Sequence, residues 1–139
     1  MLITFAWLLM QFAQSAGVDV ELVHDPAVLS FCRVLVRHAN AQRDREHGAF
    51  VVRTPEGITY FVAWPPSGEK DVLRWYGRFP EGTVAVLHTH EAWDPQASKI
   101  DRRAAQASGI PIYVLTPFQI TKTTGGPTRA VISGNWLRR

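Results

Sequence analysis

The strongest constraint on the fold is one continuous apolar run, residues 83–87, that ends in two histidines. A short run with no charged side chain is typical of a strand that is buried on both faces of a sheet. His88 and His90 come directly after it, and because side chains alternate along an extended chain, both imidazoles point the same way. The run therefore predicts a central strand with a pair of histidines at its carboxyl end.

The length and composition favour one globular domain. The 139 residues include 46% hydrophobic and 19% charged residues, which are the proportions of an ordinary folded protein. The net charge of +3 comes from arginines scattered along the chain, without a basic stretch of the kind that binds phosphates, so we expect no nucleic-acid partner. The single cysteine, Cys32, cannot form an intramolecular disulfide or a cysteine-based zinc site.

The N-terminal segment, residues 1–16, differs from the rest. Its first twelve residues are almost wholly apolar and small residues come next, as in a secretory signal peptide, but the usual preceding basic residues are absent. The apolar run is too short to predict a stable membrane span. Three interpretations stay open: a signal peptide, an apolar helix that packs on the domain, and a misassigned start. The protein is accordingly either exported or cytoplasmic. In either case residues 17–139 form the domain.

Helical and extended patterns alternate along this domain. Residues 18–22 are extended, and Asp25-Pro26 then has the N-cap and first-turn signature of a helix, whose apolar residues recur at steps of three and four. A second such signature, Asp94-Pro95, predicts a helix through residue 107, with Gly109 as its C-terminal cap. The first helix is expected to end near residues 43–45, and a short helix is expected at 71–76.

Strands account for most of the remainder. β-Branched and aromatic runs bounded by Gly and Pro predict strands at 48–53, 58–63, 110–116, 118–122 and 129–132, besides the central one. The order of elements predicts the α/β class, with a single mixed β-sheet flanked by helices.

Metal chemistry is indicated by two residues downstream of the histidines. Ser98 and Asp101 are three residues apart, so a helix places them on one face, near the end of the preceding strand. Two imidazoles and a carboxylate are ordinary zinc ligands, and three protein ligands with one open position form a catalytic zinc site. We therefore expect His88, His90 and Asp101 to bind Zn²⁺ and to activate a water molecule.

Such a site also needs a general base. Glu46 is the best candidate, because pairing of strand 48–53 with the central strand brings it to the same edge of the sheet. A surface salt bridge with a neighbouring arginine is the alternative. Glu91 comes directly after His90, but adjacent residues of a strand face opposite ways.

Ser98 also has two possible roles. Its hydroxyl can donate a hydrogen bond to a developing oxyanion, or it can cap the N-terminus of the helix.

These residues together resemble the signature of the JAB/MPN (JAMM) metalloproteases: His88-x-His90, seven intervening residues, then Ser98-x-x-Asp101, with Glu46 upstream. The resemblance extends from about residue 32 to residue 115. It implies a cytidine-deaminase-like α/β fold and zinc-dependent hydrolysis of peptide or isopeptide bonds. It also implies that the histidines and Asp101 bind zinc, that Glu46 handles the proton of the water, and that Ser98 steadies the tetrahedral intermediate.

The chain departs from this family in one respect near Glu46. The glutamate of the family is often followed by glycine three residues on, whereas here Gly48 comes after two. The resemblance implies a protein or peptide substrate, including the ubiquitin-like proteins that some members process, although no insertion of the kind that grips ubiquitin is evident. Two other functions remain open: a non-catalytic binding or scaffold module on the same fold, and a metal-dependent amidase acting on a non-protein amide.

Overall fold

The computed structural model describes residues 21–41, 46–64 and 79–138. In this part of the chain six strands form one mixed sheet in the order β2-β1-β3-β4-β5-β6. The strands are β1 (Gly48–Arg53), β2 (Thr59–Ala63), β3 (Thr83–Thr89), β4 (Ile112–Thr116), β5 (Gln119–Thr123) and β6 (Arg129–Ser133). β3 and β4 are parallel, and the other neighbours are antiparallel.

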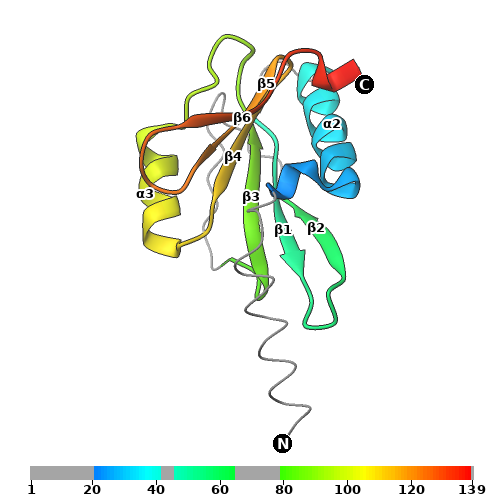
Figure 1. Cartoon of the computed structure of the whole chain (residues 1–139), viewed down its shortest axis with the longest axis vertical. Helices are drawn as coiled ribbons and strands as arrows, with labels where there is room; N and C mark the ends of the chain where they lie inside the picture. The colour runs from blue at the N-terminus through cyan, green and yellow to red at the C-terminus, as the bar shows by residue number, and fades with distance from the viewer. Residues whose placement is uncertain (1–20, 42–45, 65–78, 139) are drawn as a thin grey trace, which may run out of the picture.

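Among the described residues, two α-helices and two short 3-10 helices accompany the sheet: η1 (Leu22–His24), α2 (Pro26–Ala41), α3 (Lys99–Ser108) and η2 (Trp136–Arg138). Figure 1 shows α2 and α3 on opposite sides of the sheet. The predicted α/β class, a single mixed sheet flanked by helices, is confirmed. α3 makes the crossover between β3 and β4, because parallel strands cannot be joined by a tight turn.

The central strands are buried on both faces, as their apolar runs predict. In β1, Ala49 and Val51 belong to the core that includes Cys32 of α2, whereas Phe50 and Val52 belong to the core that includes Ala105 of α3. The two cores arise because successive side chains point to opposite faces. Burial raises the pKa of the Cys32 thiol to about 12, so this cysteine is an inert core residue at neutral pH.

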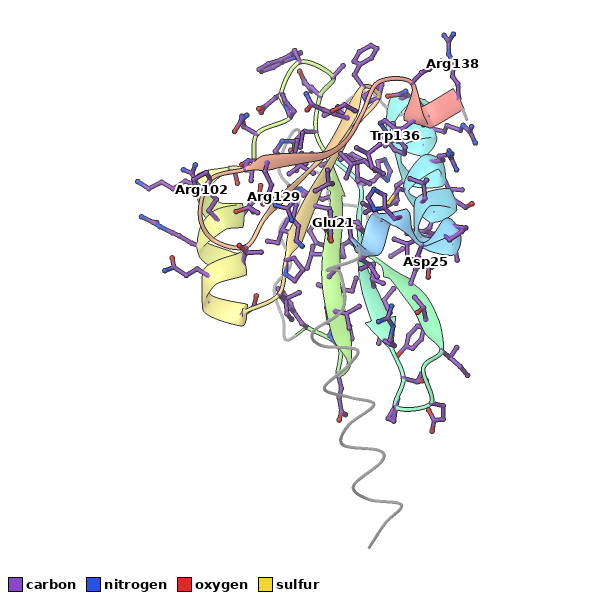
Figure 2. The ribbon with its side chains drawn as sticks, in the orientation of Figure 1. Glu21, Asp25, Arg102, Arg129, Trp136 and Arg138 are labelled. Carbon is purple, nitrogen blue, oxygen red and sulfur yellow. The ribbon has the colours of Figure 1, made fainter. Side chains whose placement is uncertain are left out.

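The C-terminal segment is anchored against α2. The indole Nε1 of Trp136 donates to the carbonyl of Thr116 at 2.9 Å, and Arg33 Nε of α2 donates to the carbonyl of Trp136 at 3.0 Å. Figure 2 shows Trp136 between the end of the sheet and α2. These bonds keep η2 on the α2 face.

The prediction that the second helix begins at Asp94-Pro95 was wrong. α3 begins at Lys99, because Ser98 and Asp101 form a capping box that satisfies two main-chain N–H groups. Asp94 instead lies in a turn in which its N–H donates to the carbonyl of Glu91 at 3.0 Å. The expected end of this helix is confirmed, since Gly109 is its left-handed C-cap at φ 70°.

The expectation of extended chain at residues 18–22 is wrong at Leu22, which begins the 3-10 helix η1. The N–H of Asp25 closes that turn by donating to the carbonyl of Leu22. Residues 18–20, the segment 1–16, the expected helix end at 43–45 and the short helix at 71–76 lie outside the described residues. Among the described helices, none has the length and hydropathy needed to cross a bilayer.

Glu21 holds the start of the described chain to the sheet. Its carboxylate accepts hydrogen bonds from Tyr113 Oη at 2.9 Å, from Lys122 Nζ at 3.1 Å and from Arg129. Figure 2 shows Glu21 and Arg129 next to each other in the middle of the molecule. Burial by itself raises the pKa of Glu21, but these three donors outweigh it and lower that pKa below its usual value.

A Glu21→Gln variant is therefore expected to lose about 2 kcal/mol of the free energy of unfolding at pH 7, the size of a hydrogen bond to a charged group. Because the pKa of Glu21 is lower in the folded state, the ionised carboxylate stabilises the fold at any pH above its usual pKa. This stabilisation is lost as the pH falls through the lowered pKa and the carboxylate becomes protonated. Urea unfolding at pH 7 and pH 3 measures both effects. Exposed Glu56 provides the control, since Glu56→Gln should change stability by less than about 0.5 kcal/mol.

Candidate metal centre

The two histidines lie at the carboxyl end of β3, as the sequence predicts. His88 pairs with Gly48 across the β1–β3 ladder, and His90 comes directly after the last residue of the strand. Their side chains are 6% and 8% exposed, and the ring centroids are 4.6 Å apart. Two imidazoles are thus close together in a nearly dry environment.

Asp101 reaches the histidines from the first turn of α3. Its Oδ2 lies 3.2 Å from His88 Nε2 and 3.8 Å from His90 Nε2. The same oxygen accepts a hydrogen bond from the main-chain N–H of Ser98 at 2.8 Å, and Ser98 Oγ accepts one from the N–H of Asp101 at 3.0 Å. The capping box that starts α3 therefore also orients the carboxylate toward the histidines.

Glu46, His88 and His90 form a group that could hold a metal ion, and Asp101 lies beside both histidines. His88 Nε2 is buried and, within the described chain, makes no hydrogen bond of acceptable geometry, although a carboxylate oxygen is 3.2 Å away. The lone pairs of an imidazole nitrogen and a carboxylate oxygen repel each other unless a proton or a metal ion lies between them. Ligand atoms about 2.0–2.1 Å from a tetrahedral zinc are about 3.3 Å from one another, and the two distances from Asp101 Oδ2 to the Nε2 atoms are 3.2 and 3.8 Å.

The charges around His88 favour a positive charge at this position. Burial by itself lowers the pKa of His88, but the carboxylates of Asp101 and Glu46 outweigh it and raise that pKa to about 9. Burial by itself raises the pKa of Asp101, but His88 and the Ser98 hydrogen bonds outweigh it and hold that pKa far below its usual value. Burial and the neighbouring His88 lower the pKa of His90. The two carboxylates thus favour a positive charge at His88, which a proton on the imidazole supplies.

His90 is oriented by the loop that comes after it. Its Nδ1 lies 3.2 Å from the carbonyl oxygen of Asp94, which can only accept, so Nδ1 donates. That tautomer leaves the lone pair of Nε2 for a metal ion, in the usual manner of histidine ligands.

Glu46 lies at the same edge of the sheet. Its Oε2 is 3.8 Å from His88 Nδ1, and one ligand atom from each of Glu46, His88 and His90 lies within 4.8 Å of the other two. The β1–β3 pairing brings Glu46 there, as the sequence predicts. The structure therefore places two carboxylates around the histidines, Asp101 beside the Nε2 atoms and Glu46 beside Nδ1 of His88. Glu91 is exposed, and its carboxylate accepts from the indole of Trp93.

Ser98 is the N-cap of α3, so the capping interpretation of this serine is confirmed. Its hydroxyl oxygen accepts from Asp101, which leaves the hydroxyl proton able to donate. The side chain is exposed beside the metal centre.

Trp64, whose side chain the sequence suggests as part of the core or of a groove wall, packs beside the candidate metal centre. Its ring centroid is 6.1 Å from that of His88, and it covers Gly48 so closely that a Cβ there would lie 2.5 Å from Cε3 of the indole. The position of Gly48, two residues after Glu46, is thus required by the tryptophan that closes this side of the site. The glycine itself is the one signal in the sequence, but its partner lies beyond the end of another strand.

A Gly48→Ala variant is expected to displace the indole and to lose about 1–3 kcal/mol of unfolding free energy, the usual cost of overpacking. Because Trp64 contacts the His88 region, zinc affinity should fall as well. Denaturant unfolding and a zinc titration measure the two effects. Gly126→Ala is the matched control: a Cβ at Gly126 meets nothing within 4 Å, so this variant should keep both properties.

No family model, curated protein or solved structure matches this chain.

Proposed function

We propose that the protein is a zinc metallopeptidase of the JAB/MPN type that hydrolyses a peptide or isopeptide bond. The observation that supports this best is the meeting of Asp101 Oδ2 with the Nε2 atoms of His88 and His90, where His88 Nε2 is buried without a hydrogen bond in the described chain. A JAB/MPN fold agrees with the position of these residues, at the carboxyl end of a central strand and at the start of the next helix.

In this proposal His88, His90 and Asp101 hold the zinc ion. When bound, zinc lowers the pKa of a coordinated water toward about 7 and makes a nucleophile available at neutral pH. The protein's own groups then do three things. Asp101 stays ionised and neutralises charge, Glu46 takes a proton from the water and returns it to the leaving amine, and the Ser98 hydroxyl donates to the oxyanion.

The surroundings of the centre suit a protein or peptide substrate. Trp93, in the loop between His90 and Ser98, is 77% exposed, and Ile100, next to Asp101, is 72% exposed. Large apolar side chains in contact with water at one edge of a site favour binding of a partner with apolar groups. We propose that these two side chains contact the substrate.

Zinc content and hydrolysis test the proposal together. Protein purified without chelator is expected to contain one zinc per chain by elemental analysis and to cleave unfolded casein. Zinc without hydrolysis of any peptide or isopeptide would favour the amidase alternative or a structural metal. A protein that neither contains nor binds zinc contradicts the proposal and favours a scaffold module.

A further inference from the structure

Thr89 lies between the two histidines but does not face the metal centre. It is the last residue of β3 and is 3% exposed. Because side chains alternate along a strand, the Thr89 side chain points to the face opposite that of His88 and His90. A buried hydroxyl on this face needs a partner.

That partner is the main chain of His47. The N–H of His47 donates to Thr89 Oγ1 at 2.9 Å, and the N–H of Thr89 donates to the carbonyl of His47 at 2.8 Å. In a regular antiparallel pair the first of these bonds goes to a main-chain carbonyl. Here the hydroxyl takes that place, so both polar groups of the His47 backbone are bound to one residue, 42 positions away in the sequence.

His47 lies between Glu46 and the first residue of β1. Its ring also packs edge-on against His38 of α2, with centroids 4.9 Å apart. The backbone next to Glu46 is therefore attached to β3 and α2, and the Glu46 carboxylate lies 3.8 Å from His88 Nδ1 on the other side of the strand. A shift of the His47 backbone would move Glu46 relative to the histidines.

We propose that Thr89 is a positioning residue, whose hydroxyl holds the His47 backbone and thereby places the Glu46 carboxylate beside the metal centre. This inference rests on the proposed function, in which Glu46 handles the proton. Threonine at this position thus has a catalytic consequence without touching metal or substrate, because a displacement of about 1 Å in a reacting group can cost about 100-fold in rate.

Two substitutions at Thr89 separate the hydroxyl from the shape of the side chain. Thr89→Val keeps the shape and removes the acceptor, whereas Thr89→Ser keeps the acceptor. In the zinc-loaded protein we expect Thr89→Val to lower kcat for casein by about 10–100-fold with little change in KM, and Thr89→Ser to restore most of it. Zinc affinity should stay near that of the wild type, because no ligand atom is changed.

A second measurement is independent of activity. Hydrogen exchange of the His47 amide should be slow in the wild type and in Thr89→Ser, and faster in Thr89→Val. In the Co²⁺-loaded protein, the pseudocontact shifts of Glu46 should move in Thr89→Val alone. The control is Thr123→Val, which removes another buried hydroxyl, one that donates to the Gly126 carbonyl at 3.0 Å in the turn after β5, and should leave kcat and the Glu46 shifts unchanged.

A Thr89→Val variant with wild-type kcat and an unchanged His47 exchange rate would overturn the inference. Loss of kcat that serine does not restore would also count against it, because the methyl group would then be responsible. If the wild type hydrolyses no peptide or binds no metal, the proposed function fails by itself. The hydrogen-exchange rates then decide whether the hydroxyl holds the backbone beside Glu46.

Discussion

The Glu46→Gln variant is expected to keep its zinc and to lose about 10²–10⁴-fold in kcat/KM, the usual contribution of a general base. Glutamine has nearly the shape of glutamate but cannot take a proton, and Glu46 lies beside the histidines without being one of the three proposed ligands. Zinc content by elemental analysis and steady-state kinetics on casein measure the two properties on the same sample.

Zinc affinity decides between two roles for Glu46. Besides acting as the proposed base, Glu46 is placed to orient His88. Its Oε2 lies 3.8 Å from His88 Nδ1, and a carboxylate commonly holds this second nitrogen of a histidine that binds a metal. If Glu46 acts chiefly in that way, the glutamine variant should bind zinc about 10–100-fold more weakly, and excess zinc should restore activity. Glu56→Gln is the matched control, because Glu56 is exposed in the turn between β1 and β2, and it should behave as the wild type. Full activity of Glu46→Gln would remove this residue from the mechanism.

The Asp101→Asn variant is expected to bind zinc more than about 100-fold more weakly, because removal of an outer-shell partner already costs about 10–100-fold and here the charge of a ligand is lost. The amide oxygen of asparagine can still accept from the Ser98 N–H, so the helix should remain. A competitive zinc titration and a circular dichroism spectrum test both points. Glu56→Gln is the control, since Glu56 is exposed and lies in the turn between β1 and β2, at the other end of β1 from His88. Equal zinc affinities of wild type and Asp101→Asn would contradict the assignment.

The same variant tests the electrostatics of the metal-free centre. The pKa of His88 is raised from 6.5 to about 9, so its protonation stabilises the folded state. That contribution is complete below pH 6.5 and is lost as pH rises to about 9. The free energy of unfolding of chelator-treated wild type should therefore fall between pH 6.5 and about 9. In Asp101→Asn the same free energy should fall by a smaller amount. An identical pH dependence in both would mean that Asp101 is not the main cause of the shift.

Much of the fold is determined by local patterns. The apolar run before His88 predicted a strand buried on both faces, and it is the third strand in a six-stranded sheet. Gly109 ends α3 where the sequence places the cap. The start of α3 was predicted four residues too early, because Asp94-Pro95 and the capping box at Ser98 are both start signals, and their strengths cannot be ranked without the tertiary contacts of the loop.

The residue types of the candidate site, and the facing of His88 and His90, are determined by the sequence alone. Alternation along a strand is a local property that neighbouring residues set. The position of Glu46 depends on the β1–β3 register, and the packing of Trp64 on Gly48 depends on a contact between distant parts of the chain. The bond between Thr89 and His47 joins residues 42 positions apart. Such contacts depend on how the whole core packs. Only the tertiary structure therefore shows that the carboxylates of Glu46 and Asp101 lie on either side of the histidines. It also shows that Thr89 binds the backbone of His47, next to Glu46.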